Sequence, residues 1–173
     1  MKKVLVCISG ASGASLGLKL YNLIPSEYER YLVLSKNAKI VLEKEENIFL
    51  DDDIAAAPAS GSFGIDITFV VPTSMNTLAK IALGIADNLI TRAALVAIKE
   101  KKKLILAPRE MPFSEIHLEH MLKLSRLQNV FIAPPIIAYY NKPKTIEDIE
   151  MFLIGKWLDL AGIKNNYYKR WNG

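Results

Sequence analysis

The chain has 173 residues, of which 51% are hydrophobic and 23% are charged, and its net charge is +4. This length lets one domain, residues 1–173, bury a substantial core without disulfides or metals. The mildly basic balance does not predict nucleic-acid binding, because clustered arginines with aromatics are lacking; a phosphate-rich ligand is a further interpretation. No apolar run approaches the roughly 18 residues of a membrane span. Met1-Lys2-Lys3 begins no signal-peptide pattern and Cys7 is the single cysteine, so we expect a cytoplasmic location.

The first predicted unit is a strand, a glycine-rich turn and a helix. An apolar run predicts the strand at 4–8, the turn is Ser9-Gly10-Ala11-Ser12-Gly13, and the helix is expected at 16–23. Small residues let a ligand approach the backbone, and the N–H groups that open a helix attract anions. The spacing matches neither the dinucleotide fingerprint nor the P-loop. The turn therefore predicts a site for phosphate or another polar ligand, and the alternative is a turn that only connects.

A second unit follows the same order, with a strand at 30–34, Ser35 at its end and a helix expected at 38–46. Ser35 can cap this helix or donate to a phosphate. Asp51-Asp52-Asp53 resembles the start of a magnesium-diphosphate motif, but the fifth position is Ala55, so we expect a solvated acidic turn. The hydroxyl-rich loop Ser60-Gly61-Ser62 either wraps a ligand or turns the chain.

The third unit is a buried strand at 65–71, a turn at 72–74 and a helix from Met75 onward. Ligands of open α/β sheets bind at the carboxyl ends of the strands. We therefore expect the turn that contains Ser74 to face the first glycine-rich turn.

Charged side chains follow in two places. Arg92 and Lys99 stand seven residues apart on a helix expected at 89–101, which places both on one face. A strand is expected at 103–108, and the charged pair Arg109-Glu110 follows it directly. The position at the carboxyl end of a strand favours a site over a surface ion pair.

The next helix is expected to begin after Ser114, which can cap it. His117 and His120 lie on it, but neither an H-E-x-x-H pattern nor a third ligand is present, so we expect no metal and no catalytic role for them. Five apolar residues are expected on or near its buried side: Ile116, Leu118, Met121, Leu122 and Leu124.

The C-terminal part begins with a strand at 130–133, which is broken by two prolines and is expected to continue at 136–140. Thr145 and Asp148 predict a capping box for a helix through Leu160. The aromatic residues of the tail are expected to dock on the chain itself or on a neighbouring subunit. The alternation of strands and helices predicts an α/β fold: a three-layer, Rossmann-like (flavodoxin-like) and mostly parallel sheet with helices on both faces.

Taken together, these junctions resemble the flavin prenyltransferase family (UbiX-like) of the flavin-dependent decarboxylase superfamily. The resemblance covers nearly the whole chain in the correct order. It rests on these segments: Ser9–Ala14, Ser35-Lys36, Ala59–Ser62, Ser74–Leu78, Asp87–Ala93, Lys99-Glu100, Pro108–Phe113, Tyr140, Pro143 and Arg170-Trp171.

The resemblance implies a specific reaction. Members of the family transfer a dimethylallyl group from dimethylallyl monophosphate to N5 and C6 of reduced FMN, without a metal. The prenylated FMN serves a UbiD-type decarboxylase, with ubiquinone synthesis as one pathway. Family members commonly form homo-oligomers, dodecamers in particular, with sites at subunit junctions.

The resemblance also implies roles for individual residues. The FMN-binding set is Gly10, Ala11, Ser12, Ser35, Ser60, Ser62, Ser74 and Arg92. The set for the substrate phosphate is Lys99, Arg109, Glu110, Tyr140 and Lys156. Ser12, Lys99, Glu45 and Glu110 are the expected catalytic residues, with Ser12 near the reacting flavin edge and Glu110 favoured as proton acceptor, and Trp171 is expected to form an aromatic wall. Many relatives have arginine where this chain has Lys156, which replaces a bidentate fork by a point charge.

Two alternatives remain from the residues alone. A flavin-dependent cysteine decarboxylase is suggested by Pro72-Thr73-Ser74-Met75-Asn76, but such enzymes have an early histidine and a late cysteine that this chain lacks. A non-catalytic FMN-binding subunit is the other alternative. The presence of Lys99, Arg109, Glu110 and Tyr140 does not favour a non-catalytic site.

Overall fold

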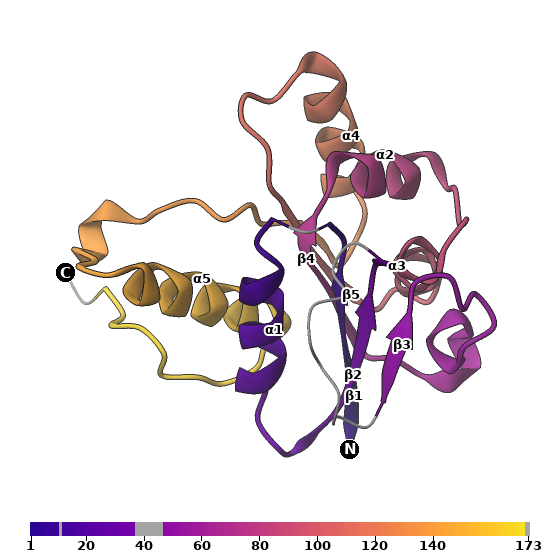
Figure 1. Cartoon of the computed structure of the whole chain (residues 1–173), viewed down its shortest axis with the longest axis horizontal. Helices are drawn as coiled ribbons and strands as arrows, with labels where there is room; N and C mark the ends of the chain where they lie inside the picture. The colour runs from indigo at the N-terminus through magenta and orange to yellow at the C-terminus, as the bar shows by residue number, and fades with distance from the viewer. Residues whose placement is uncertain (11, 37–46, 172–173) are drawn as a thin grey trace.

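The computed structural model describes residues 1–10, 12–36 and 47–171 (Figure 1). Its centre is a six-stranded sheet with the order β3-β2-β1-β4-β5-β6, and each neighbouring pair is parallel. This confirms the predicted parallel α/β sheet. The strands are β1 (Lys2–Ile8), β2 (Tyr28–Leu34), β3 (Ile48–Leu50), β4 (Ile67–Thr73), β5 (Lys103–Pro108) and β6 (Val130–Ile132). The helices are α1 (Ala14–Leu23), α2 (Met75–Leu83), α3 (Leu89–Lys99), α4 (Glu115–Ser125) and α5 (Ile146–Ala161).

Helices cover both faces of the sheet because successive strand residues point to opposite sides. In β1, Val4, Val6 and Ile8 belong to a core shared with α1 and α5. Leu5 and Cys7 belong to the opposite core, which is shared with α2 and α3. Burial raises the pKa of the Cys7 thiol well above its usual range, so this cysteine is a packing residue.

The strand order reverses direction between β1 and β4. From β1 the chain proceeds outward to β2 and β3, whereas β4, β5 and β6 extend the sheet on the other side. Their carboxyl ends therefore border the point where ligands bind in doubly wound folds.

Local capping signals placed the helix starts correctly. Ser74, Ser114 and Thr145 each accept a hydrogen bond from a backbone N–H of the first turn that follows them. The predicted acidic turn is also confirmed, because Asp52 is exposed and lies 3.0 Å from Lys36 Nζ. The helix expected at 38–46 lies outside the described residues.

Two predictions about the second half of the chain were wrong. Residues 136–140 do not extend a strand; the chain leaves the sheet at Pro134-Pro135 and reaches a short 3₁₀ helix, η4 (Tyr139–Asn141). Proline lacks the N–H that a ladder requires, which accounts for the departure. In α4, the side chains of Ile116, Leu118 and Leu122 are exposed, and Leu124 is buried. The helix contacts α2 and β6, and its buried contact with the core is near its C-terminal end (Figure 1).

No helix within the described ranges is both long enough and apolar enough to cross a membrane.

Candidate functional site

Ser9 joins the two strand ends at the reversal point. Its Oγ donates to the carbonyl of Pro72 at 3.1 Å and accepts from the N–H of Ser74 at 2.9 Å. The residue is almost completely buried. Ser9 was not among the site residues chosen from the sequence, although a hydroxyl that directly follows a buried strand is a signal that could have identified it. It holds the end of β1 against the start of α2.

Gly10, Ser35 and Ser74 meet beside this link. The N–H of Gly10 donates to Ser35 Oγ at 3.2 Å, and a Cβ at Gly10 would lie 3.8 Å from the Cβ of Ser74. Gly10 has φ +99°, a conformation that L side chains rarely adopt. The turn after β4 therefore faces the first glycine-rich turn, as predicted. Three predicted flavin-binding residues come together here from the ends of β1, β2 and β4.

The beginning of α1 is held close to the crevice by Gly17. A Cβ at this position would stand 2.9 Å from Cγ1 of Ile8, closer than real side chains pack. Ser12 is exposed in the turn that precedes the helix. Ala11 and Glu45 lie outside the described residues.

A cationic pocket of about 470 Å³ lies between α3 and the loop that precedes β4. Arg92 and Lys99 both line it, which confirms that they share one face of α3. Ser60 also lines it, and its Oγ lies 2.9 Å from Oγ of Ser62. Lys99 forms an ion pair with Glu100, and this contact lowers the pKa of the Glu100 carboxyl.

A second pocket of about 740 Å³ lies beyond the carboxyl ends of β5 and β6. Arg109 and Glu110 line it together with apolar residues and prolines. Buried Thr73 fixes the strand that leads there, because its Oγ1 donates to Val70 O at 2.6 Å and accepts from Ala107 N at 3.0 Å. The pair that the sequence assigned to a site thus lines a pocket.

The remaining predicted residues are located near the C-terminus. The rings of Tyr140 and Trp171 are 6.0 Å apart at 85°, and both side chains are largely exposed. Lys156 is exposed on α5. The five predicted phosphate-site residues therefore do not share one of these two pockets: Lys99 lines the first, Arg109 and Glu110 line the second.

One of the two histidines of α4 contacts the start of its own helix. His117 Nδ1 accepts from the N–H of Ser114 at 3.2 Å, which completes a capping box. The described part of the chain contains no group of three His, Cys, Asp or Glu residues that could hold a metal ion.

Comparison with known proteins identifies the family. A family model described as Flavoprotein matches residues 1–158. The flavin prenyltransferase UbiX of Campylobacter jejuni subsp. jejuni is 50% identical, over 98% of both chains. The chain belongs to the UbiX flavin prenyltransferase family. As a member of this family it is a prenyltransferase, which favours the transferase prediction over both alternatives.

Two solved structures resemble this UbiX-family chain closely. A dodecameric FMN-dependent UbiX-like decarboxylase from Escherichia coli O157:H7 is 43% identical with a TM-score of 0.91, over 99% of this chain and 100% of that one. AnUbiX in complex with FMN and dimethylallyl pyrophosphate is 39% identical with a TM-score of 0.90, over 99% and 98% of the two chains.

Proposed function

We propose that this flavin prenyltransferase transfers the dimethylallyl group of dimethylallyl monophosphate to N5 and C6 of reduced FMN. The prenylated FMN would then serve a UbiD-type decarboxylase. The observation that carries the proposal is the meeting of Gly10, Ser35 and Ser74 at the point where the strand order reverses. Backbone and hydroxyl groups without bulky side chains suit a flat, polar ligand there.

The described residues fit FMN. Gly10 leaves its backbone open to a ligand, and the hydroxyls of Ser35 and Ser74 border the same crevice. Arg92 and Ser60 line the cationic pocket, and we assign them to the phosphate of FMN because a guanidinium binds phosphate with two parallel hydrogen bonds. Ala11, Ser12 and Ser62 complete the proposed flavin-binding set.

The chemistry requires a stabilised leaving group and a proton acceptor. When bound, reduced FMN supplies the nucleophilic N5 and C6 atoms. Lys99, Arg109 and Lys156, with the hydroxyl of Tyr140, would bind the departing phosphate as its carbon–oxygen bond breaks. Glu110 would accept the proton released at N5. Bond formation at C6 requires that the double bond of the dimethylallyl group gain a proton and that C6 lose one, and Ser12 with the bound phosphate would relay these two protons.

A complete site requires more than one copy of the chain in this proposal. Arg109 and Glu110 line one pocket, whereas Tyr140 lies beside Trp171 near the C-terminus. The UbiX-like relative from Escherichia coli O157:H7 is described as dodecameric. We propose that a homo-oligomer brings the C-terminal aromatics of one copy to the Arg109 pocket of the next copy.

Complementation tests this arrangement. Arg109→Ala and Tyr140→Phe variants would each be weakly active alone. Co-assembly of the two would restore part of the activity if the two residues act across a subunit junction. An absence of recovery would place both residues in a site within one chain.

The reaction itself is tested under anaerobic conditions with reduced FMN and either dimethylallyl monophosphate or the diphosphate. The extracted flavin should gain the mass of one prenyl unit and acquire a new absorption spectrum with the monophosphate. The product should also activate a UbiD-type apo-decarboxylase. Turnover with the diphosphate alone would exclude the proposed donor, and unchanged FMN with both donors would exclude the function.

A further inference from the structure

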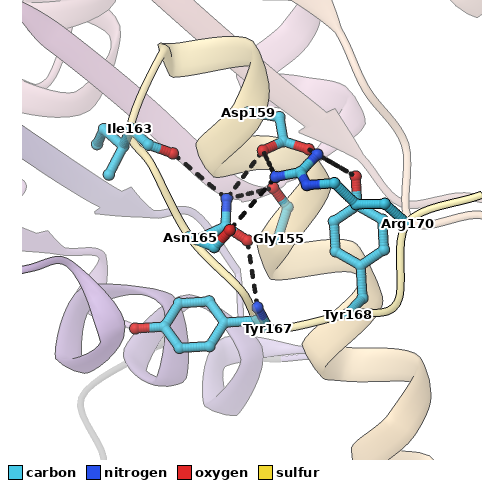
Figure 2. A network of polar contacts seen from close by, with 7 residues as sticks. All are labelled: Gly155, Asp159, Ile163, Asn165, Tyr167, Tyr168 and Arg170. Carbon is cyan, nitrogen blue, oxygen red and sulfur yellow. Dashed lines mark hydrogen bonds and ion pairs between the residues drawn. The ribbon is translucent and has the colours of Figure 1, made fainter.

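The C-terminal segment 162–171 folds back along α5 (Figure 2), and we refer to it as the strap. It ends at Trp171, whose ring lies beside that of Tyr140. It starts at Gly162, which ends the helix, and the following Ile163 is buried in the core. Asn165 Nδ2 then donates to the carbonyl of Gly155 at 3.2 Å and to Asp159 Oδ1 at 2.9 Å. Tyr167 OH donates to Leu23 O at 2.8 Å, which ties the strap to α1. These contacts fix the strap on the rest of the fold as far as Tyr167.

Asp159 of α5 is the centre of the polar contacts that hold the strap. Its carboxylate accepts hydrogen bonds from both terminal nitrogens of Arg170, with Nη1–Oδ2 at 2.9 Å and Nη2–Oδ1 at 2.8 Å. It also accepts from Tyr168 OH at 2.6 Å and from Asn165 (Figure 2). Two parallel charge-assisted hydrogen bonds fix the guanidinium plane as well as its position. The pKa of Asp159 is lowered chiefly by Arg170, which is consistent with an ionised acceptor.

Two routes lead from Asp159 to the aromatic residues. Arg170 directly precedes Trp171 in the chain, so the bidentate contact fixes the backbone that carries the indole. Tyr168 packs on Phe152 with ring centroids 5.0 Å apart, and Phe152 packs on Tyr140 at 5.9 Å. Tyr140 and Trp171 are then in contact with each other. Both routes converge on the same pair of rings.

We infer that Asp159 and Arg170 are positioning residues of the transferase, which hold Tyr140 and Trp171 as one rigid aromatic unit for the prenyl phosphate. This inference rests on the proposed function, because that function gives Tyr140 and Trp171 their roles. Asp159 itself contacts the strap and has no assigned contact with a substrate. Asp159 therefore affects the geometry of the residues that bind the prenyl phosphate. FMN is assigned to other residues, at the strand ends and on α3.

The test compares Asp159→Asn and Arg170→Lys with the wild-type chain. Asparagine has one uncharged oxygen that can accept hydrogen bonds, where aspartate has two that share a charge. Lysine keeps the positive charge of arginine but lacks its planar guanidinium. We expect the KM for dimethylallyl monophosphate to rise about tenfold or more in Asp159→Asn, with a smaller rise in Arg170→Lys and an unchanged dissociation constant for FMN. The double variant should be no worse than Asp159→Asn, because both changes remove the same interaction.

Glu147→Gln is the matched control. Glu147 lies on the same helix and pairs with Lys19 at 2.7 Å, so its substitution removes an ion pair of α5 away from the strap. Its KM and FMN affinity should equal those of the wild type. Thermal melts and the oligomeric state, measured for all variants, identify a general loss of structure.

Tryptophan fluorescence gives a readout without turnover. The chain has two tryptophans; Trp157 is buried and Trp171 is largely exposed. Acrylamide quenching of Trp171 should change in Asp159→Asn and stay unchanged in Glu147→Gln. Wild-type quenching and wild-type KM in both strap variants would overturn the inference, as would a parallel loss of FMN affinity. If the wild-type chain forms no prenylated FMN, the proposed function fails, and with it the role in prenyl-phosphate binding; the quenching result then reports on the strap contact alone.

Discussion

Replacement of Ser9 by alanine tests how the crevice is assembled. The substitution removes the Oγ that links the ends of β1 and β4. The Pro72 carbonyl still accepts a hydrogen bond from the N–H of Ser9 at 3.3 Å, so losing the Oγ donor costs this carbonyl little. The N–H of half-buried Ser74 loses the acceptor at 2.9 Å, and a donor left without a partner away from water costs about 1–3 kcal/mol. For a chain of this size, about 2 kcal/mol corresponds to a decrease in Tm of roughly 4–8 °C.

The assay is thermal unfolding at one fixed protein concentration, followed by FMN titration. Ser9→Ala should melt lower than the wild type and bind FMN more weakly, because Ser74 belongs to the proposed flavin site. Ser125→Ala is the control: its Oγ donates to Leu122 O within the exposed part of α4, and its removal should change stability by no more than about 0.5 kcal/mol. An identical Tm for Ser9→Ala and Ser125→Ala would refute the assignment of Ser9 as the structural link.

Three further predictions concern charged residues. Arg92→Ala should raise the FMN dissociation constant about 10- to 100-fold, since a hydrogen bond to a charged group contributes about 1.5–3 kcal/mol; calorimetric titration measures it, and an unchanged constant contradicts the phosphate role. Glu110→Gln should slow formation of prenylated FMN without weakening FMN binding, and a wild-type rate would exclude Glu110 as the proton acceptor. Because Arg170 lowers the pKa of Asp159 in the fold, this carboxylate stabilises the protein above the ordinary aspartate pKa of about 4, and its contribution is lost as the pH falls through the lowered value. The difference in Tm between wild type and Asp159→Asn should therefore shrink in acid. A difference independent of pH would contradict the stabilising role of the ionised carboxylate.

The sequence was most informative where the cause of a structure is local. Ser114 and Thr145 predicted helix starts because a capping hydroxyl needs only the next turn of its own chain. The apolar run at 4–8 likewise predicted the strand β1. The carboxyl-end rule even predicted that the turns at Gly10 and Ser74 would face each other.

The sequence was least informative where the cause lies in a distant partner. The apolar pattern of α4 predicted burial for Leu118 and Leu122, yet a pattern does not specify how much of a helix reaches the core. The run 136–140 has the composition of a strand, but two preceding prolines direct it away from the sheet. Ser9 has its role because Pro72 and Ser74 lie beside it, and neither is near it in the sequence.

Two glycines within helices show how such distant contacts can still leave a trace in the sequence. Gly17 and Gly155 occupy helix interiors, where glycine costs roughly 1 kcal/mol relative to alanine. Each has a neighbour that a side chain would meet: Ile8 at Gly17, and the ring of Tyr168 at Gly155, where a Cβ would lie 2.8 Å from Cε1. In α1, glycine replaces a better helix former because the helix packs closely on the strands of the crevice. In α5, it does so because the strap packs closely on the helix. A glycine within a helix of this chain therefore identifies the surface on which another segment packs closely, and both surfaces adjoin residues of the proposed site.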